Sequence, residues 1–472
     1  MLKFAKKNWA GITLSILVAV YVITLSYLSI RRHYAFASSF DLANMDQTVW
    51  NTANGRFFAV SGMTGTTSRF SYHADLILAL LSPFYLIYDR IDTLLFLQSL
   101  VIGLAAIPIY LLARDVLKNK VKGLVIASVY LLNPGVQWSN IYDFHGVTMA
   151  MAFLPAAFYS AYKKKWNWMF LFSFLTLLTK ESASLAVVML GVYIFIFYRQ
   201  WLRGTILMVA GAVWFIVTVF YLIPHAAVSG AFWVWNWFDI SKYSNDSGVG
   251  FDISKILWKF TNIDSGPYYL TLLKPFGFIP LLGFPWFFLA VPDFFINMMS
   301  TQSQMRSNTF HYDSIIVVGL VMSTILAWKL IDIIFKKYKW IGWLIGVWLL
   351  AVAIRTNYHY SPLPTTPSYW RPMYDVGQDE IAFEKALRAI PKEASVAASS
   401  EVRGHITHRE NAFNLPQMVF GADYVAMVDQ NRIIGDYKPK DFEGSVIEKL
   451  LVDEKYSLEF HQGHFYLFKR IW

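Results

Sequence analysis

The sequence contains no cysteine and little charge: Asp, Glu, Lys and Arg together make up 15% of its 472 residues. The first absence excludes a thiolate nucleophile, an iron–sulfur cluster and a disulfide. The charged fraction is well below the roughly 25% of an average soluble chain. Hydrophobic residues reach 56% and aromatic residues 18%, and the mean hydropathy is +0.41. The composition therefore excludes a cytosolic enzyme and a secreted disulfide scaffold, and indicates a polytopic membrane protein.

Common catalytic motifs are missing as well. The sequence holds no G-x-x-x-x-G-K-[ST], no H-E-x-x-H and no G-x-S-x-G. These patterns mark a phosphate-binding loop, a zinc protease helix and a serine nucleophile elbow. An ATP-driven pump, a zincin protease and an α/β-hydrolase therefore lose support.

The charges that are present divide the chain into two parts. Residues 1–355 carry 28 Lys and Arg against 15 Asp and Glu, a net charge of +13. Residues 356–472 carry 13 against 16, a net charge of −3, and lack the run of about 20 apolar residues that a membrane span needs. We predict a transmembrane domain at 1–355 and a soluble domain at 356–472. The basic excess falls in short clusters between apolar runs, which indicates membrane topology and no nucleic-acid partner.

Those clusters set the predicted topology in a plasma membrane. Lysines precede the first apolar segment, Ala10–Ile30, and place the N-terminus in the cytoplasm. If all later clusters are cytoplasmic, an even number of crossings separates them. The segment 74–88, which is short and contains Pro83, is therefore predicted to lie on the outer surface. The sequence thus predicts about eleven crossings, a first external loop at about 31–90, and two short Pro- and Gly-broken segments at 270–283 and 285–300.

An odd number of crossings places the C-terminal domain outside the cell. Its pattern is helix-like at 379–390 and 445–454, and strand-like at 395–399, at 424–429 and before 468, which predicts a small α/β fold. Its one dense polar cluster, Gly404–Glu410, contains His405 and His408. A metal site is conceivable there, but a solvated helix end is favoured.

The acidic residues of the membrane domain fall mainly on the outer side of this topology. Asp41 begins the first external loop, where Phe40, Ala43, Gln47 and Trp50 recur at helical spacing. This pattern predicts a short amphipathic helix on the membrane surface, with Asp41 at its N-terminal end. Asp41 is then either a functional acid or only the cap of that helix.

Two further polar pairs end predicted spans on the outer side. Asp143 and His145 could share a metal or a phosphate, or simply bond to each other. Lys180 and Glu181 follow the fifth span, where a lysine opposes the inside-positive trend and becomes a candidate phosphate ligand. The alternative is a snorkelling lysine paired with its neighbour. The other outward candidates are His73, Arg306, His311, Tyr312, Arg355, His359 and Tyr360.

Taken together, these features resemble the GT-C superfamily of membrane glycosyltransferases, which includes protein O-mannosyltransferases and the aminoarabinose transferases of lipid A. An acid in the first external loop, a second acid after span three, a lysine after span five and an outer soluble domain carry the resemblance. The chain is more closely similar to a prokaryotic family catalogued as domain of unknown function 2079. That similarity rests on Phe40-Asp41-Leu42, Asp46-Gln47, Trp50-Asn51, His73, Asn133-Pro134, Asp143-Phe144-His145 and Lys180-Glu181.

The resemblance implies a helical bundle with outer juxtamembrane helices and a sugar donor carried on a polyprenyl phosphate or pyrophosphate. The acceptor is a glycan, a lipid or a protein. Asp41 falls on the catalytic first-loop acid, Asp143 on the second acid, and Lys180 on a lysine of the aminoarabinose transferases. The catalytic candidates are thus Asp41, Asp46 and Asp143, and the substrate-binding candidates are His73, His145, Lys180, Glu181, His311, Tyr312 and Arg355.

Whether a divalent metal ion takes part is left open by the resemblance. Glu181 stands where the aminoarabinose transferases have glycine, and the first loop has no strict D-x-D. A bound metal would have Asp41, Asp143 and His145 as its ligands.

The chemistry of glycosyl transfer gives an independent reason for these residue types. The transition state is oxocarbenium-like, and the acceptor hydroxyl loses a proton as the phosphate leaves. A carboxylate as general base and cations on the phosphate meet both needs. A transporter or flippase and a non-catalytic scaffold are the alternatives, since intramembrane charges and broken helices also mark transport paths. Convergence of Asp41, Asp143 and Lys180 on one outward cavity would favour the transferase.

Overall fold

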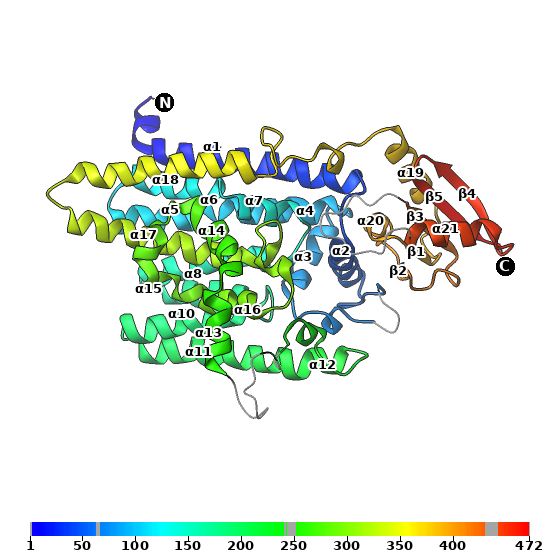
Figure 1. Cartoon of the computed structure of the whole chain (residues 1–472), viewed down its shortest axis with the longest axis horizontal. Coiled ribbons are helices and arrows are strands. Elements are labelled where there is room, and N and C mark those ends of the chain that lie inside the picture. Colours follow the sequence, from blue (N-terminus) through cyan, green and yellow to red (C-terminus); the bar gives the residue numbers. More distant parts are fainter. Residues whose placement is uncertain (1, 63–66, 240–241, 243–251, 430–441, 472) are drawn as a thin grey trace.

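The computed structural model describes residues 2–62, 67–239, 242, 252–429 and 442–471. Long helices run side by side and form a bundle, and a small sheet domain lies at one end of it (Figure 1). This architecture confirms the predicted membrane bundle with a small C-terminal α/β unit. The bundle contains α1 (Leu2–Tyr34), α4 (Asp92–Leu104), α5 (Ala106–Leu117), α6 (Lys120–Leu131), α7 (Pro134–Ile141), α8 (Ala150–Tyr162), α9 (Trp166–Leu177), α10 (Ala183–Phe197), α11 (Trp201–Val217), α12 (Ile223–Ala226), α14 (Gly266–Leu273), α15 (Phe284–Phe287), α16 (Val291–Met299), α17 (Ser314–Ile334) and α18 (Lys339–Tyr360).

Six helical runs in the described residues are long and apolar enough to cross a membrane. They are Asn8–Tyr34, Asp92–Leu117, Trp201–Ala226, Ile279–Met299, His311–Ile334 and Lys339–Tyr360. The apolar helices α9 and α10 have 12 and 15 residues. At 1.5 Å per residue they are about 18 and 23 Å long, less than the roughly 30 Å of a hydrocarbon core. The full set of about eleven crossings stays a prediction.

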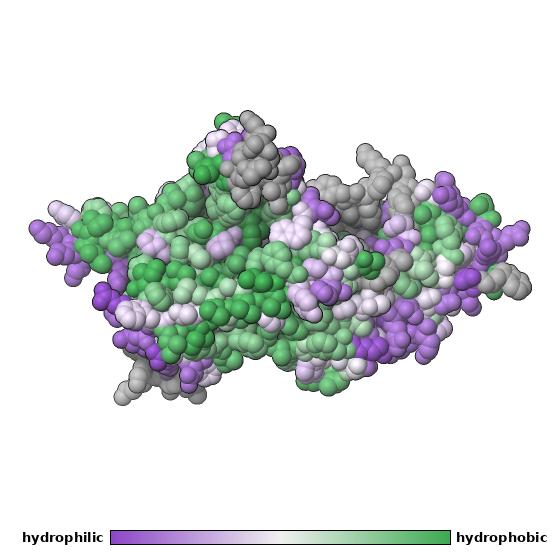
Figure 2. Space-filling model, turned by 90° about the horizontal axis from the view of Figure 1, so that it is seen from below, coloured by the Kyte–Doolittle hydropathy of each residue, from purple (hydrophilic) through white to green (hydrophobic). Residues whose placement is uncertain are grey.

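The surface of the bundle is apolar where a membrane would surround it. Figure 2 shows hydrophobic residues over the middle of the bundle and hydrophilic residues over both ends. On α1, the side chains of Ile16, Val20 and Ile23 are exposed. An apolar surface of this extent is stable against lipid and not against water.

Glycines let α10 and α11 pack with their backbones nearly in contact. A Cβ atom on Gly204 would lie 2.7 Å from the carbonyl oxygen of Gly191, and a Cβ atom on Gly211 would lie 2.7 Å from that of Ser184. Close approach through small residues is a usual mode of helix packing in membranes. The turn at 178–182, which joins α9 to α10, is thereby fixed beside α11.

The chain from α14 to α16 forms a hairpin, and its tip corrects a predicted boundary. The reversal lies at Gly277 and Phe278, whose backbone φ angles are 57° and 64°. Trp348 Nε1, near the middle of α18, donates to the Gly277 carbonyl oxygen at 3.1 Å. The predicted break between 283 and 285 is therefore wrong, because the glycine that adopts the left-handed turn conformation is at 277.

Two short helices pack against the end of the bundle nearest the sheet. α3 (Ile77–Tyr85) has 9 residues, about 14 Å, and is too short to cross, as predicted. α2 (Phe40–Ala53) forms where expected, but its predicted position on the membrane surface is wrong. Every residue from Leu42 to Val49 is buried, because α2 packs against α3 on one side and hydrogen-bonds with the sheet domain on the other.

The C-terminal domain has a five-stranded sheet in the order β2-β1-β3-β5-β4. The strands β1, β2 and β3 are parallel, and β5 pairs antiparallel with β3 and β4. The pattern at 395–399 correctly predicted β1, whereas β2 was missed, because it has only 3 residues. The elements are β1 (Val396–Ala398), β2 (Ala412–Asn414), β3 (Tyr424–Val428), β4 (Tyr456–Gln462), β5 (Phe465–Arg470), α19 (Gln378–Arg388), α20 (Ser400–Arg403) and α21 (Phe442–Val452).

The segment after α20 docks this domain onto the bundle. His405 stacks on Phe36 at the end of α1, with ring centroids 4.0 Å apart. Thr407 donates to Asp46 of α2, and Thr407 is 1% exposed. The predicted solvated helix end at 404–410 is therefore wrong, because this segment is a turn buried against α2.

Candidate active site

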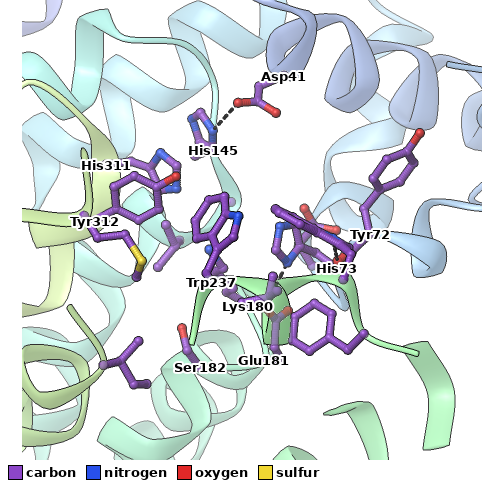
Figure 3. Close-up of a pocket in the computed structure, with 18 of the residues that line it drawn as sticks. Asp41, Tyr72, His73, His145, Lys180, Glu181, Ser182, Trp237, His311 and Tyr312 are labelled. Atoms are coloured by element: carbon purple, nitrogen blue, oxygen red, sulfur yellow. Dashed lines mark hydrogen bonds and ion pairs between the residues drawn. The ribbon is translucent and has the colours of Figure 1, made fainter. Parts of the chain in front are cut away.

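A cavity of about 1040 Å³ lies where the bundle, α2 and the sheet domain meet. Its walls come from segments far apart in the sequence: the start of α2, residues 69–75, 142–147, 179–182, 215–238, 293–299 and 304–315. Ser400 and Gln417 of the sheet domain also line it. Figure 3 shows that polar side chains from opposite walls point into this space.

Asp41 lies at one wall, in the first turn of α2. Ser39 caps this helix, because its hydroxyl accepts from the Asp41 backbone N–H at 3.2 Å. The Asp41 carboxylate is thus not the cap; its Oδ2 lies 3.6 Å from His145 Nε2, and the side chain is 31% exposed. Burial raises the pKa of Asp41, but His145, Arg69 and His73 together lower it below its usual value. The carboxylate is therefore ionised at neutral pH and able to accept a proton.

Two histidines form a stack beside Asp41. The rings of His145 and His311 have centroids 3.6 Å apart at an interplanar angle of 18°. The backbone N–H of His145 donates to Gln98 Oε1 at 2.8 Å, which fixes the residue on the bundle. The Nδ1 atoms of both rings are buried and have no hydrogen-bond partner among the described residues.

Lys180 and Glu181 lie on another wall of the cavity. Glu181 Oε1 is 2.9 Å from His73 Nδ1, and its Oε2 accepts from the Ala74 backbone N–H at 3.2 Å. Burial raises the pKa of Glu181, but His73 and Lys180 outweigh it and lower the pKa to about 2. Lys180 Nζ lies 5.9 Å from the ring centroid of Tyr312, and it forms no ion pair within the described residues. Glu181 is thus engaged by His73, and Lys180 presents its charge to the cavity (Figure 3).

Three charged cavity residues, Arg69, Asp75 and Asp293, were missed by the sequence patterns. Arg69 is 2% exposed and makes a bidentate pair with Asp75, with Nη2 to Oδ2 at 2.6 Å. Asp293 of α16 is 7% exposed, and its Oδ2 has no hydrogen-bond partner in the described chain. An acid inside an apolar segment is a general signal of function and could have identified Asp293. Arg69 has no such signal, because an arginine in a polar loop is ordinary.

The rest of the cavity is aromatic and apolar. The 3-10 turn η4 (Trp233–Trp237) crosses its side, and Trp233 Nε1 donates to the Tyr72 carbonyl oxygen at 3.2 Å. The Thr301 backbone N–H donates to the Trp237 carbonyl oxygen at 2.8 Å. These bonds fasten the turn at both ends. The lining also includes the aromatic residues Phe40, Phe215, Phe232, Trp235, Phe238, Phe295 and Phe310.

Asp143, a predicted catalytic residue, lies outside the cavity lining. Its carboxylate is buried and paired with Arg32 Nη1 at 2.7 Å. The same carboxylate accepts from the Ser39 backbone N–H at 3.0 Å. Because Ser39 caps α2, Asp143 and Arg32 hold the helix end that presents Asp41. The geometry makes Asp143 a positioning residue.

Asp46 and Arg355 also lie away from the cavity lining. Asp46 is fully buried and bonds to Tyr85, Thr407 and His408. Arg355, a predicted substrate-binding residue, is exposed on α18 and does not line the cavity. Of the ten predicted site residues, the cavity brings together Asp41, His73, His145, Lys180, Glu181, His311 and Tyr312.

The predicted metal-ligand set is not assembled. Asp143 is held by Arg32, so Asp41 and His145 are the only two of the three predicted ligands that meet. Within the described residues no group of three His, Asp or Glu side chains could hold a metal ion. A divalent cofactor therefore stays a prediction without a defined site.

The arrangement of a helical bundle with a small sheet domain at one end is shared with two solved structures. The chain is similar to the crystal structure of ArnT from Cupriavidus metallidurans bound to undecaprenyl phosphate, with a TM-score of 0.54 and 10% identity over 96% of this chain and 97% of ArnT. It is also similar to the arabinofuranosyltransferase AftD from Mycobacteria, with a TM-score of 0.52 and 10% identity. That match covers 97% of this chain and 40% of AftD.

The chain belongs to the family DUF2079, described as a predicted membrane protein, whose model matches residues 32–437. No curated protein matches the chain. The matched region contains the whole cavity and most of the sheet domain, which confirms the resemblance stated from the sequence motifs.

Proposed function

We propose that this protein transfers a sugar from a polyprenyl-phosphate donor to an acceptor hydroxyl. One observation carries the proposal: a single cavity holds an ionised carboxylate, Asp41, on one wall and, on another, a cation, Lys180, that has no ion pair among the described residues. The GT-C fold and the undecaprenyl phosphate bound in ArnT support the same class of donor.

Asp41 acts as the general base in this proposal. The acceptor oxygen forms a bond to the anomeric carbon, the bond from that carbon to the phosphate oxygen breaks, and the acceptor proton passes to the Asp41 carboxylate. Lys180 stabilises the charge that develops on the leaving phosphate. The buried Arg69 adds positive potential on the same side, although Asp75 neutralises part of it.

His145 positions the base in this scheme. Its Nε2 lies 3.6 Å from Asp41 Oδ2, and its ring stacks on that of His311 and lies 5.6 Å from that of Tyr142. An imidazole fixed in this way keeps the carboxylate directed into the cavity and ionised.

The aromatic part of the cavity receives the apolar portion of the donor. Trp235, Phe238 and Phe295 line it, and Phe295 lies on a candidate membrane span. A prenyl chain stays in lipid at this side while the phosphate reaches Lys180. No specific observation favours the transporter alternative, since the polar groups described gather at one end of the bundle.

The lipid that co-purifies with the protein tests this proposal. Mass spectrometry of the purified chain is expected to find a polyprenyl phosphate or its glycosylated form. Asp41→Asn should retain this lipid, because the base is not needed for binding, whereas Lys180→Met should lose most of it. Asp375→Asn, at an exposed carboxylate between α18 and α19, is the matched control. Absence of any prenyl lipid from the wild-type protein would contradict the proposal.

We also propose that the N-terminus is cytoplasmic and that the cavity and sheet domain face outward. Three lysines support this orientation. Lys336 and Lys337 lie between α17 and α18, Lys339 begins α18, and all three are at the end of the bundle opposite the sheet (Figure 1).

A further inference from the structure

Asp293 is an acid of the cavity to which the proposed transfer gives no role. It lies in the first turn of α16, lines the cavity and is 7% exposed. Its Oδ2 has no hydrogen-bond partner among the described residues. Rotation about the last side-chain bond exchanges the two carboxyl oxygens, so either can meet a ligand in the cavity. Because a buried carboxyl group without a partner is costly, Asp293 points to a ligand that supplies one.

The protein groups around Asp293 do not supply that partner. The charge of Lys180 acts on Asp293, but the two side chains form no ion pair in the described part of the chain. The amide nitrogen of Asn297, one turn further along α16, donates to three other groups, on Tyr268, Tyr312 and Asp313. The helix dipole favours an acid in the first turn, and the backbone N–H of Asp293 acts on its own carboxyl group, yet Oδ2 keeps no partner.

The chemistry of a carboxyl group narrows the choice of ligand. In its ionised form it only accepts hydrogen bonds, and in its protonated form it donates one as well. A hydroxyl group donates and accepts, so it matches Asp293 in both forms. A phosphate brings acceptors and negative charge, which an ionised carboxylate repels. In the proposed transfer the acceptor hydroxyl meets Asp41, so the hydroxyl groups left for Asp293 are those of the donor sugar.

We propose that Asp293 hydrogen-bonds to a hydroxyl group of the donor sugar and so distinguishes the glycosylated lipid from unmodified polyprenyl phosphate. This role rests on the proposed function. Lys180 binds the phosphate, which both lipids carry, and Asp293 binds the sugar, which only the donor carries. A buried polar group that binds a hydroxyl discriminates against a ligand without it, because the group is then left unpaired. The spent lipid is therefore held more weakly than the donor, and a new donor replaces it.

The lipids that the protein retains test this role. The purified protein is incubated with a lipid extract of the membranes from which it was isolated, and mass spectrometry measures the glycosylated and unmodified polyprenyl phosphates that stay bound. The wild-type protein should enrich a glycosylated form roughly 10-fold over the extract. Asp293→Leu should lose this enrichment and retain the unmodified form as the wild type does. Lys180→Met should lower the retention of both forms alike.

The outcomes of this experiment separate the role of Asp293 from the proposed function. Enrichment that persists in Asp293→Leu, or that is missing from the wild type, would overturn the role in sugar binding. Equal loss of both lipids in Asp293→Leu would also overturn it, because Asp293 would then act through the phosphate site of Lys180. A wild-type protein that retains neither lipid would contradict the proposed function itself.

Thermal unfolding of the lipid-free protein separates ligand binding from a structural role. Asp293→Leu should raise the Tm, because it removes a buried carboxyl group that lacks a partner. The control Asp313→Leu should lower the Tm, because Asp313 Oδ1 accepts from the Tyr268 hydroxyl at 2.6 Å, and the substitution leaves that hydroxyl unpaired. A fall in the Tm of Asp293→Leu as large as that of Asp313→Leu would show that Asp293 stabilises the fold and would overturn the proposal.

Discussion

Asp41 and Asp46 lie five residues apart on α2, yet their surroundings differ completely. Asp41 is 31% exposed, faces the cavity and has its carboxylate 3.6 Å from His145. Asp46 is fully buried and contacts Tyr85, Thr407 and His408. The first turn of α2 therefore belongs to the cavity, and the next turn belongs to the contact with the sheet domain.

This difference teaches what separates a reactive carboxylate from a structural one in this protein. An ionised carboxylate has about four lone-pair sites, and the three partners of Asp46 together with its complete burial leave no access for an acceptor hydroxyl. Asp143 repeats the structural case, because Arg32 and Ser39 occupy it. All three acids are aspartates outside the long apolar helices, and their burial and their partners distinguish them.

Alanine at Asp41 should impair turnover, whereas alanine at Asp46 should impair stability. Asp41→Ala is expected to lower turnover of the endogenous lipid by about 10²–10⁴-fold, because the general base is gone. Asp46→Ala should instead lower the free energy of unfolding by about 3–5 kcal/mol, because it leaves buried partners of a charged group unpaired. Thermal unfolding and lipid turnover measured on both variants check this contrast. Full turnover in Asp41→Ala would contradict the role of Asp41 as the general base.

Removing His145 should sharpen the role of Asp41. The imidazole helps to lower the pKa of Asp41, so His145→Ala should raise that pKa and move the acid limb of the kcat/KM profile to higher pH. A shift of one pH unit changes the rate on that limb about tenfold. His359→Ala, at an exposed histidine of α18, should leave the profile in place. An unchanged acid limb in His145→Ala would show that His145 does not set the pKa of the general base.

The ion pair of Asp46 with His408 predicts that the stability of the protein falls at alkaline pH. Burial lowers the pKa of His408, but Asp46 and Asp89 outweigh it and raise the pKa to about 9. The unfolded value is about 6.5, so this contribution is complete below pH 6.5 and is lost as the pH rises through 9. The wild-type Tm should fall in this window more steeply than that of His408→Gln. If the two Tm curves run parallel over this pH range, the charge of His408 does not stabilise the contact between α2 and the sheet domain.

The last test asks on which side of the membrane Asp41 and Asp46 lie, and its cysteine variants should change turnover least of all. Lys385→Cys, on the outer surface of the sheet domain, should react with an impermeant thiol reagent in intact cells without loss of turnover. Lys336→Cys, at the opposite end of the bundle, should react only after lysis. The reverse labelling pattern would place the cavity in the cytoplasm.

The sequence by itself determined the class of the protein. Charge, hydropathy and the length of apolar runs are one-dimensional properties, so they identified the membrane bundle, the short segment 74–88 and the soluble C-terminal unit. Motif spacing identified seven of the cavity residues, because each lies near the end of an apolar segment. Most of the strands and helices of the sheet domain were also predictable from their periodicity.

Only the tertiary structure decided which of those residues act together. Arg32 and Asp143 are 111 residues apart, and Asp46 and Thr407 are 361 apart, so no local pattern reveals their contacts. The burial of α2, the turn at 404–410 and the roles of Arg69 and Asp293 depend on the same distant packing. The physical reason is that hydrogen bonds, burial and electrostatic fields act through space, whereas a sequence pattern records only neighbours along the chain.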